Sequence, residues 1–268
     1  MSNLFDNGER ALATQFLSCG YVIADAANSA ALERIRTAAA QETAKFLGVS
    51  TPPQPGTFLD EIAHHVSSET LNDLRLHLIN ALPAFPWFRE AYFGCARPLL
   101  ETLVGNELAM QRGMGLSIQL PGDDSSLLPL HSDAWSEDSP FEVVLWIPLV
   151  DCYRTKSMFI LPREKDALWR DKVHEYARTG VHALFKELEA QVQWLDIPYG
   201  KVLLFTHTLM HGNHINREST TRWSINMRFK GLFTPYSDKR LGEFFEPITI
   251  RPASRIGMQY ELPGGFHE

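Results

Sequence analysis

The sequence is poor in cysteine, has no excess of basic residues and contains no long apolar run. Its three cysteines, Cys19, Cys95 and Cys152, are widely separated and lack Cys-x-x-Cys spacing. This pattern argues against a disulfide framework and favours a reduced, cytoplasmic compartment. The formal net charge of −7 disfavours a nucleic-acid partner, because phosphate binding needs a basic face. The most apolar run, residues 143–150, is too short to cross a bilayer, and the N-terminus shows no secretory signal.

Helical periodicity dominates residues 1–105. Apolar side chains recur at helical spacing in residues 29–48, 67–83 and 88–105, and Pro98 is expected to kink the third segment. The proline-rich residues 52–56 are expected to form a loop. These stripes are interpreted as packing surfaces for the rest of the chain.

The period changes to two from residue 106 onward. Strands are predicted over residues 116–120, 141–150, 158–161, 192–197, 202–205 and 222–230, with a charged helical insert at 163–190. Helices followed by many short strands indicate an α+β fold, a double-stranded β-helix (cupin-like jelly roll) buttressed by N-terminal helices. We expect one domain over residues 1–268: a helical part to residue 105, a jelly-roll core over 106–232 and a C-terminal tail over 233–268.

The tripeptide His131-Ser132-Asp133 is the first candidate metal-binding motif. In an extended chain, residues two apart project to the same side, so this imidazole and this carboxylate can hold one metal ion. Such a triplet also arises by chance, as a histidine hydrogen-bonded to a nearby aspartate.

A histidine-rich turn after residues 201–206 offers a third ligand, His211. Two histidines and one carboxylate leave coordination positions open, an arrangement that suits iron(II) oxygenases. An alternative is a zinc site formed by His207, His211 and His214 alone. That alternative leaves His131 and Asp133 without a role.

Arg222 lies eleven residues after His211 and alternates with apolar residues, on the same strand face as Ser224. Together they can hold a carboxylate through a guanidinium and a hydroxyl. A polar row pointing into a barrel needs an anionic partner to offset its desolvation. The alternative is a solvated strand face.

Taken together, His131-Ser-Asp133, His211-Gly212 and Arg222-Trp-Ser224 resemble the iron(II)- and 2-oxoglutarate-dependent dioxygenases, in particular the phytanoyl-CoA dioxygenase-like branch. The resemblance covers residues 113–231. It implies that His131, Asp133 and His211 bind iron and act in catalysis, with O2 and 2-oxoglutarate as co-substrates. It also implies that Arg222 and Ser224 bind the distal carboxylate of 2-oxoglutarate, with Gln119 contacting the same co-substrate.

The segment from His131 to Glu142, followed by Thr155-Lys-Ser-Met158, resembles a sub-branch associated with carbohydrate biosynthesis. It implies hydroxylation of a small molecule, such as a sugar or sugar-linked metabolite. Halogenating relatives lack the carboxylate ligand, so the presence of Asp133 favours hydroxylation. Trp135, Lys156 and Arg228 are candidate substrate contacts. Trp135 could instead pack in the core or a loop, Lys156 could be an ordinary surface lysine, and Arg228 could form a buried ion pair. The rival interpretations of the whole chain are a cupin-type isomerase or hydrolase and a non-catalytic binding module.

Overall fold

The computed structural model describes residues 5–125 and 127–262. The helices are α1 (Asn7–Cys19), α2 (Ser29–Leu47), α3 (Pro55–Asp60), α4 (Ser68–Ala81), α5 (Phe88–Gly94), α6 (Arg97–Leu103), α7 (Arg163–Arg170), α8 (Val181–Leu188) and α9 (Pro252–Gln259), with short 3-10 turns η1 (Ile62–His64), η2 (Asp133–Ser136), η3 (Arg154–Lys156) and η4 (Val173–Tyr176). The strands are β1 (Tyr21–Asp25), β2 (Leu108–Gln111), β3 (Gly115–Gln119), β4 (Val143–Pro148), β5 (Phe159–Ile160), β6 (Gln193–Trp194), β7 (Lys201–Thr206), β8 (His211–Gly212), β9 (Arg222–Gly231) and β10 (Phe245–Thr249).

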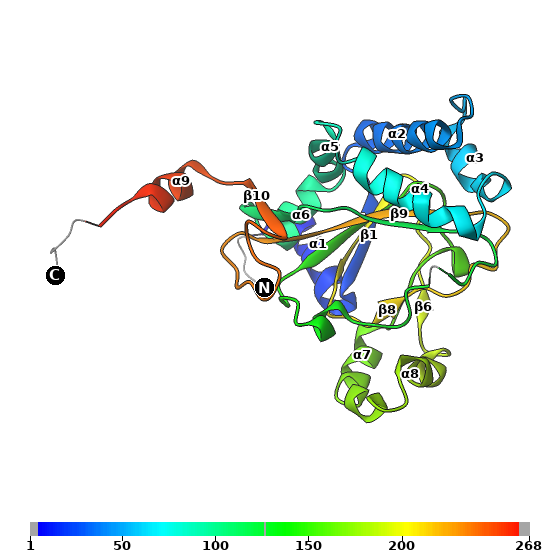
Figure 1. Cartoon of the computed structure of the whole chain (residues 1–268). Helices are drawn as coiled ribbons and strands as arrows, with labels where there is room; N and C mark the ends of the chain where they lie inside the picture. Colours follow the sequence, from blue (N-terminus) through cyan, green and yellow to red (C-terminus); the bar gives the residue numbers. More distant parts are fainter. Residues whose placement is uncertain (1–4, 126, 263–268) are drawn as a thin grey trace.

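Two antiparallel sheets form the centre of the molecule. The larger sheet has the order β1-β7-β4-β9-β2-β10, with β3 also pairing with β9, and the smaller one has the order β6-β5-β8. Helices α2 to α5 cover one side of the larger sheet, whereas α7 and α8 lie beyond the smaller sheet (Figure 1). The predicted combination of N-terminal helices, antiparallel strands and a helical insert is confirmed.

Local sequence signals fix the boundaries of α2. The Asn28 side chain accepts a 2.9 Å hydrogen bond from the Ala31 amide, which caps the first turn. The helix ends at Gly48, whose φ of 67° is the left-handed conformation that glycine adopts without strain. Leu32 and Ile35 are fully buried in the core shared with the larger sheet. The stripe predicted over residues 29–48 therefore packs as expected, except for Phe46, which is 36% exposed.

Strand β9 separates the helical layer from the site. Its apolar face consists of four fully buried side chains: Trp223, Ile225, Met227 and Phe229. The Trp223 indole donates a 2.7 Å hydrogen bond to the Leu59 carbonyl of α3. Arg222, Asn226 and Arg228 alternate with these residues and line a cavity. The predicted two-faced strand is confirmed, with apolar residues toward the helices and polar residues toward the cavity.

Two strands lie outside the predicted core. β1 pairs with β7, and β10 pairs with β2, so residues 21–25 and part of the predicted tail belong to the larger sheet. The prediction missed β1 because it is only five residues long and sits between two helices. The prediction missed β10 because Pro247 lies within it and proline usually argues against a strand. Proline is tolerated at a sheet edge, which is where β10 lies.

Two prolines begin helices where the sequence interpretation placed a kink or a loop. Pro98 stands in the first turn of α6, so residues 88–105 form two helices rather than one kinked helix. Pro55 likewise begins α3, inside the predicted loop over residues 52–56. Proline fits a first helical turn because the amide hydrogen it lacks has no partner there. Across residues 5–125 and 127–262, the helices are too short or too polar to span a bilayer.

Candidate metal centre

His131, Asp133 and His211 come together where β8 meets the chain segment preceding η2. His131 and His211 form an antiparallel bridge with backbone hydrogen bonds of 2.9 and 2.8 Å. Their ring centroids lie 4.3 Å apart. Asp133 Oδ1 lies 3.5 Å from His131 Nε2. Each residue offers one ligand atom, and these atoms all lie within 4.8 Å of one another, so one metal ion can contact all three.

Hydrogen bonds to the backbone fix which imidazole nitrogens face the site. His131 Nδ1 lies 2.7 Å from the Pro129 carbonyl, and His211 Nδ1 lies 2.8 Å from the Leu209 carbonyl. Because a carbonyl oxygen only accepts, each Nδ1 carries the proton and each Nε2 keeps a lone pair for a metal. Burial, aided by the neighbouring His131, lowers the pKa of His211 to about 4. His211 is therefore neutral, as a metal ligand must be.

Asp133 is held as a carboxylate. Burial alone would raise its pKa, but the facing His131 and His211 imidazoles and the Arg228 guanidinium outweigh burial and hold the pKa well below its usual range. Arg228 Nη2 lies 3.0 Å from Asp133 Oδ1. The arginine thus fixes the carboxylate that faces both histidines.

Gly212 lets the two ligand-bearing segments approach each other. A Cβ at this position would lie 2.8 Å from the Leu128 carbonyl and 2.9 Å from the Pro129 carbonyl. We expect Gly212→Ala to push His131 away from His211 and to weaken Fe(II) binding about 10- to 100-fold, as loss of a supporting contact at a metal site does. Gly113→Ala, where a Cβ would meet no heavy atom within 4 Å, is the control. Equal metal affinity in the two variants, measured by competition with a chelator, would contradict this role.

Arg228 belongs to a buried charge network rather than to a free anion site. Its Nη1 donates a 2.5 Å hydrogen bond to Asp138 and lies 3.5 Å from Glu142. Lys239 also contacts Asp138. The buried ion pair named as the alternative is therefore present, and the predicted contact of Arg228 with an acidic substrate stays a prediction, since Arg228 also lines the cavity described below. Asp138, Glu142 and His207 form a second group of closely spaced potential ligands, but Arg228 and Lys239 already pair with its Asp138 carboxylate.

Glu142 should make stability pH-dependent. Burial raises the pKa of this carboxyl from 4.5 to about 7, with Arg228 opposing the shift and Asp138 reinforcing it. Between these values the folded protein keeps a proton that the unfolded chain releases, so the free energy of unfolding falls as pH rises. The full effect is at most about 3 kcal/mol, at 1.36 kcal/mol per pKa unit.

We expect Glu142→Gln to remove this contribution. In urea denaturation from pH 5 to pH 8, the variant should gain stability relative to the unaltered protein as pH rises. Two stability curves that stay parallel across this range would contradict the assignment.

The alternative zinc site is not assembled. His207 Nε2 lies 2.8 Å from the Ser139 carbonyl, and its Nδ1 lies 3.8 Å from Asp133 Oδ2. The His214 ring instead packs on Phe185, with centroids 5.6 Å apart. Within residues 5–125 and 127–262, no group of potential ligands combines His207, His211 and His214.

A cavity of about 310 Å³ opens beside the three candidate ligands. Its apolar wall consists of Leu128, Val144, Trp146, Met158 and Phe205, and its polar wall of Ser117, Asn213, Arg222, Asn226 and Arg228. Ser117 and Asn226 were not singled out in the sequence. Both lie on the polar faces of alternating strands, so the alternation that identified Arg222 also marks them.

Arg222 is a buried cation without an acidic partner among the described residues. It is 2% exposed, and it donates hydrogen bonds to the Ser157 carbonyl at 3.0 Å and to the Ser117 hydroxyl at 2.5 Å. Its Nε and the Ser224 hydroxyl are buried without a hydrogen-bond partner. Burial lowers the pKa of Arg222 to about 10, so it stays charged at neutral pH. A buried cation with unused donors is a site for an anionic ligand.

Gln119 lies opposite Arg222 across the β3–β9 pair. Its amide nitrogen donates a 2.6 Å hydrogen bond to the His214 carbonyl, and it is not among the residues that line the cavity. The structure therefore places Gln119 beside the site as a support for the His214 segment. Its predicted contact with a co-substrate has no counterpart in the cavity lining.

Two predicted substrate contacts lie away from the cavity. Trp135 is 41% exposed and lines a separate hollow with Arg170 and Thr208. Lys156 is 1% exposed and binds Asp60 and, at 2.7 Å, the Thr220 hydroxyl. It is therefore neither the proposed substrate cation nor the surface lysine of the alternative interpretation. The Lys156–Asp60 pair joins η3 to the end of α3.

Replacing Lys156 should lower stability without affecting ligand binding. Lys156→Met leaves Asp60 unpaired, although that carboxylate is 32% exposed and can be hydrated. We expect a loss of about 1–3 kcal/mol in the free energy of unfolding, below the full cost of a broken buried pair. A raised KM for an acidic co-substrate at unchanged stability would instead restore the predicted binding role.

Sequence comparison alone identifies no relative of the chain: no protein-family model matches it, and neither does any curated protein. Solved structures do resemble it. EctD from S. alaskensis in its apoform is 14% identical, with a TM-score of 0.56 over 88% of this chain and 81% of that chain. AviO1 from Streptomyces viridochromogenes Tue57 is 18% identical, with a TM-score of 0.51 over 88% and 100%.

A third similar structure is the apo form of the non-haem monooxygenase ThoJ. It is 13% identical to this chain, with a TM-score of 0.54 over 82% of this chain and 77% of that chain. Another EctD structure contains bound Fe. At these identities the likeness concerns the fold. The chain therefore shares its fold with EctD, AviO1 and the non-haem monooxygenase ThoJ.

Proposed function

We propose that the protein is an iron(II)- and 2-oxoglutarate-dependent oxygenase that hydroxylates a small molecule and releases succinate and CO2. The observation that carries this proposal is a single cavity that joins two distinct features. One is a set of two imidazoles and one carboxylate, and the other is Arg222, a buried guanidinium without an acidic partner among the described residues. A ligand that carries both a metal-chelating end and a carboxylate matches both features.

The donor set fits iron(II). His131 and His211 present unprotonated Nε2 atoms, and Asp133 remains ionised next to Arg228. Two imidazoles and one carboxylate leave further coordination positions open for co-substrates. Iron(II) bound there would supply the oxidising chemistry by activating O2 together with a keto acid. The protein's own part is to orient the ligands and to exclude water.

Arg222 would bind the distal carboxylate of 2-oxoglutarate. Its unpartnered Nε would supply a donor to such an anion. The unpartnered Ser224 hydroxyl, on the same face of β9 although not among the residues that line the cavity, would supply a second one. The charge of the ligand would in turn compensate the buried guanidinium, which has no counter-ion among the described residues. Ser117 accepts from Arg222 Nη2 and so holds the guanidinium in place.

Hydroxylation is favoured over chloride transfer because Asp133 is present as a third ligand. The apolar wall formed by residues such as Val144 and Phe205 suits the hydrocarbon part of a substrate. A sugar-linked substrate belongs to the proposal on the strength of the sequence resemblance. We place the site in a jelly-roll core, because residues of both sheets line the cavity.

The test is consumption of 2-oxoglutarate by the purified protein. Without a primary substrate we expect slow formation of succinate that requires Fe(II) and O2 and is abolished by a chelator. Zn2+ should bind at the same residues without supporting turnover. Bound Fe(II) with neither succinate formation nor 2-oxoglutarate binding would favour a non-oxidative, cupin-type metal protein.

A further inference from the structure

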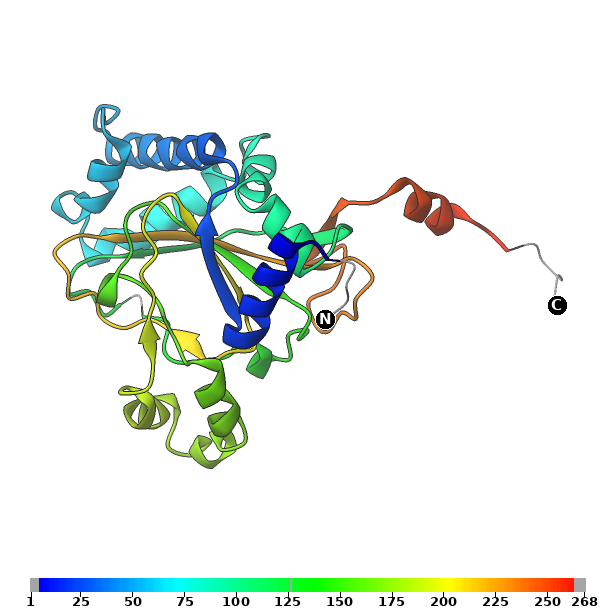
Figure 2. The same cartoon turned by 180° about the vertical axis from the view of Figure 1, so that it is seen from behind.

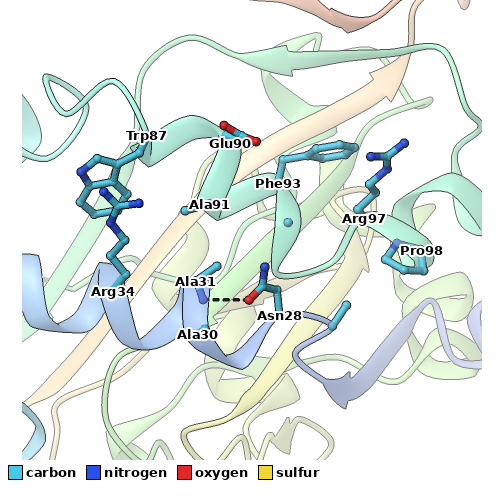
Figure 3. A pocket seen from close by; sticks show the side chains of 12 residues that line it. Asn28, Ala30, Ala31, Arg34, Trp87, Glu90, Ala91, Phe93, Arg97 and Pro98 are labelled. Atoms are coloured by element: carbon cyan, nitrogen blue, oxygen red, sulfur yellow. Dashed lines mark hydrogen bonds between the residues drawn. The ribbon is translucent and has the colours of Figure 1, made fainter.

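A second hollow lies on the helical side of the larger sheet, away from the metal centre. It has a volume of about 620 Å³ and is formed by α2, α5 and the start of α6 (Figure 3). The apolar face of β9 packs toward these helices and its polar face lines the metal cavity. The hollow and the cavity are therefore on opposite sides of the sheet, and they share no lining residue.

Small residues form the floor of this hollow, and charged and aromatic side chains form its rim. Ala31 and Ala91 leave the space between α2 and α5 open. The Arg34 guanidinium lies 4.0 Å from the Trp87 ring centroid and has no carboxylate partner among the described residues. Glu90 lies across from it (Figure 3). The hollow thus suits a short apolar segment that carries one basic and one acidic residue.

The C-terminal segment of the same chain has this composition. Residues 251–262, here called the C-terminal arm, project away from the body of the molecule (Figures 1 and 2). Four large apolar side chains of the arm are strongly exposed: Ile256 (71%), Met258 (61%), Tyr260 (65%) and Leu262 (84%). Beyond Arg251 at its root, the arm carries one charge of each sign, Arg255 and Glu261. Clustered exposed apolar residues indicate an interaction surface.

The contacts between the arm and the other described residues lie at its root. The Arg251 amide and the Ser254 hydroxyl donate hydrogen bonds of 2.9 and 2.8 Å to Glu107. The Arg251 guanidinium lies 3.7 Å from Glu101, which also pairs at 3.0 Å with Arg97 on the rim of the hollow. The root of the arm and the hollow therefore lie next to each other on one face of the molecule.

We propose that two copies of this chain exchange C-terminal arms, each α9 lying in the hollow of the other copy. An isologous dimer requires donor and acceptor surfaces on the same face, which the neighbouring root and hollow provide. Because the arm projects away from its own body, it can reach a second copy related by a two-fold axis without a change in the direction of the chain.

Size and charge agree with this arrangement. The eight residues of α9 span about 12 Å, and the lining stretch from residue 28, the N-cap of α2, to residue 34 spans about 9 Å. Arg255 would meet Glu90, and Glu261 would meet Arg34. The arm's apolar side chains would cover the alanine floor and the Trp87 and Phe93 rings.

Sedimentation equilibrium of full-length variants tests the exchange. The unaltered chain should dimerise at micromolar concentration, and Ile256→Asp with Met258→Asp in the arm should raise the dimer Kd at least about tenfold. Ala91→Trp, which fills the hollow, should do the same. Leu76→Ser, a polar replacement of a 52% exposed leucine on α4, should leave the Kd unchanged.

Two further experiments keep the proposal falsifiable if Ala91→Trp does not fold. Glu90→Arg and Arg255→Glu should each weaken the dimer, and the double variant should restore it. The arm variant and the hollow variant should each dimerise poorly alone, but a mixture of the two should form a heterodimer. In that heterodimer the intact arm of the hollow variant can lie in the intact hollow of the arm variant. A monomeric unaltered chain, a dimer insensitive to these changes, or the absence of rescue and heterodimer would overturn the proposal.

Discussion

Replacing any one of the three candidate ligands should abolish turnover. We expect His131→Ala, Asp133→Ala and His211→Ala each to lower 2-oxoglutarate consumption by roughly a factor of 1000, or about 4 kcal/mol in activation free energy. Two remaining ligands cannot hold the metal in the orientation that the reaction needs. The measurement combines succinate formation with the Fe content of the anaerobically loaded protein.

His214→Ala is the matched control for these variants. His214 lies on the same histidine-rich turn, but its ring packs on Phe185 and belongs to no ligand group among the described residues. It should therefore retain Fe content and turnover. Asp133→Ala should still fold, because Arg228 keeps its hydrogen bond to Asp138. Loss of metal in His214→Ala, or full activity in Asp133→Ala, would contradict the ligand assignment.

Arg222→Met should raise the KM for 2-oxoglutarate by about 10- to 100-fold or more, because hydrogen bonds to a charged group contribute about 1.5–3 kcal/mol each. The ligand-free variant should be as stable as the unaltered protein or more stable, since it no longer buries an unpaired charge. The increase in Tm on adding 2-oxoglutarate should disappear. Thermal unfolding with and without 2-oxoglutarate measures both effects.

Lys230→Met is the control for the loss of a buried cation from the same strand. Lys230 is fully buried and hydrogen-bonds to the Pro235 carbonyl, and it does not line the cavity. Its replacement should lower stability but leave the KM for 2-oxoglutarate unchanged. Equal effects of the two variants on this KM would show that Arg222 has no specific role.

The grouping of His131 with Asp133, two of the candidate metal ligands, could be predicted from sequence because their spacing reflects the geometry of an extended chain. His131 and Asp133 lie two residues apart, so their side chains project to the same side of the chain. Arg222 and Asn226 lie four residues apart on β9, so the alternation of that strand puts both on its polar face, which lines the cavity. Helix α2 was predictable for the same reason, since its stripe and its caps are local signals.

Ionic partners were not predictable in the same way. Lys156 pairs with Asp60, 96 residues away, and Arg228 pairs with Asp138, 90 residues away. Nothing in the sequence around either cation reveals a partner that tertiary folding supplies. Both were therefore interpreted as candidate substrate contacts, whereas the structure uses them to join distant segments and, for Arg228, to hold Asp133.

The central claim is that one cavity holds both a metal ion and a keto acid. Anaerobic titration of the metal-free protein with Fe(II) and then with 2-oxoglutarate tests it directly through the visible spectrum. The account predicts a weak charge-transfer band that requires both additions and is lost in His131→Ala. Bound Fe(II) without such a band at saturating 2-oxoglutarate would contradict it.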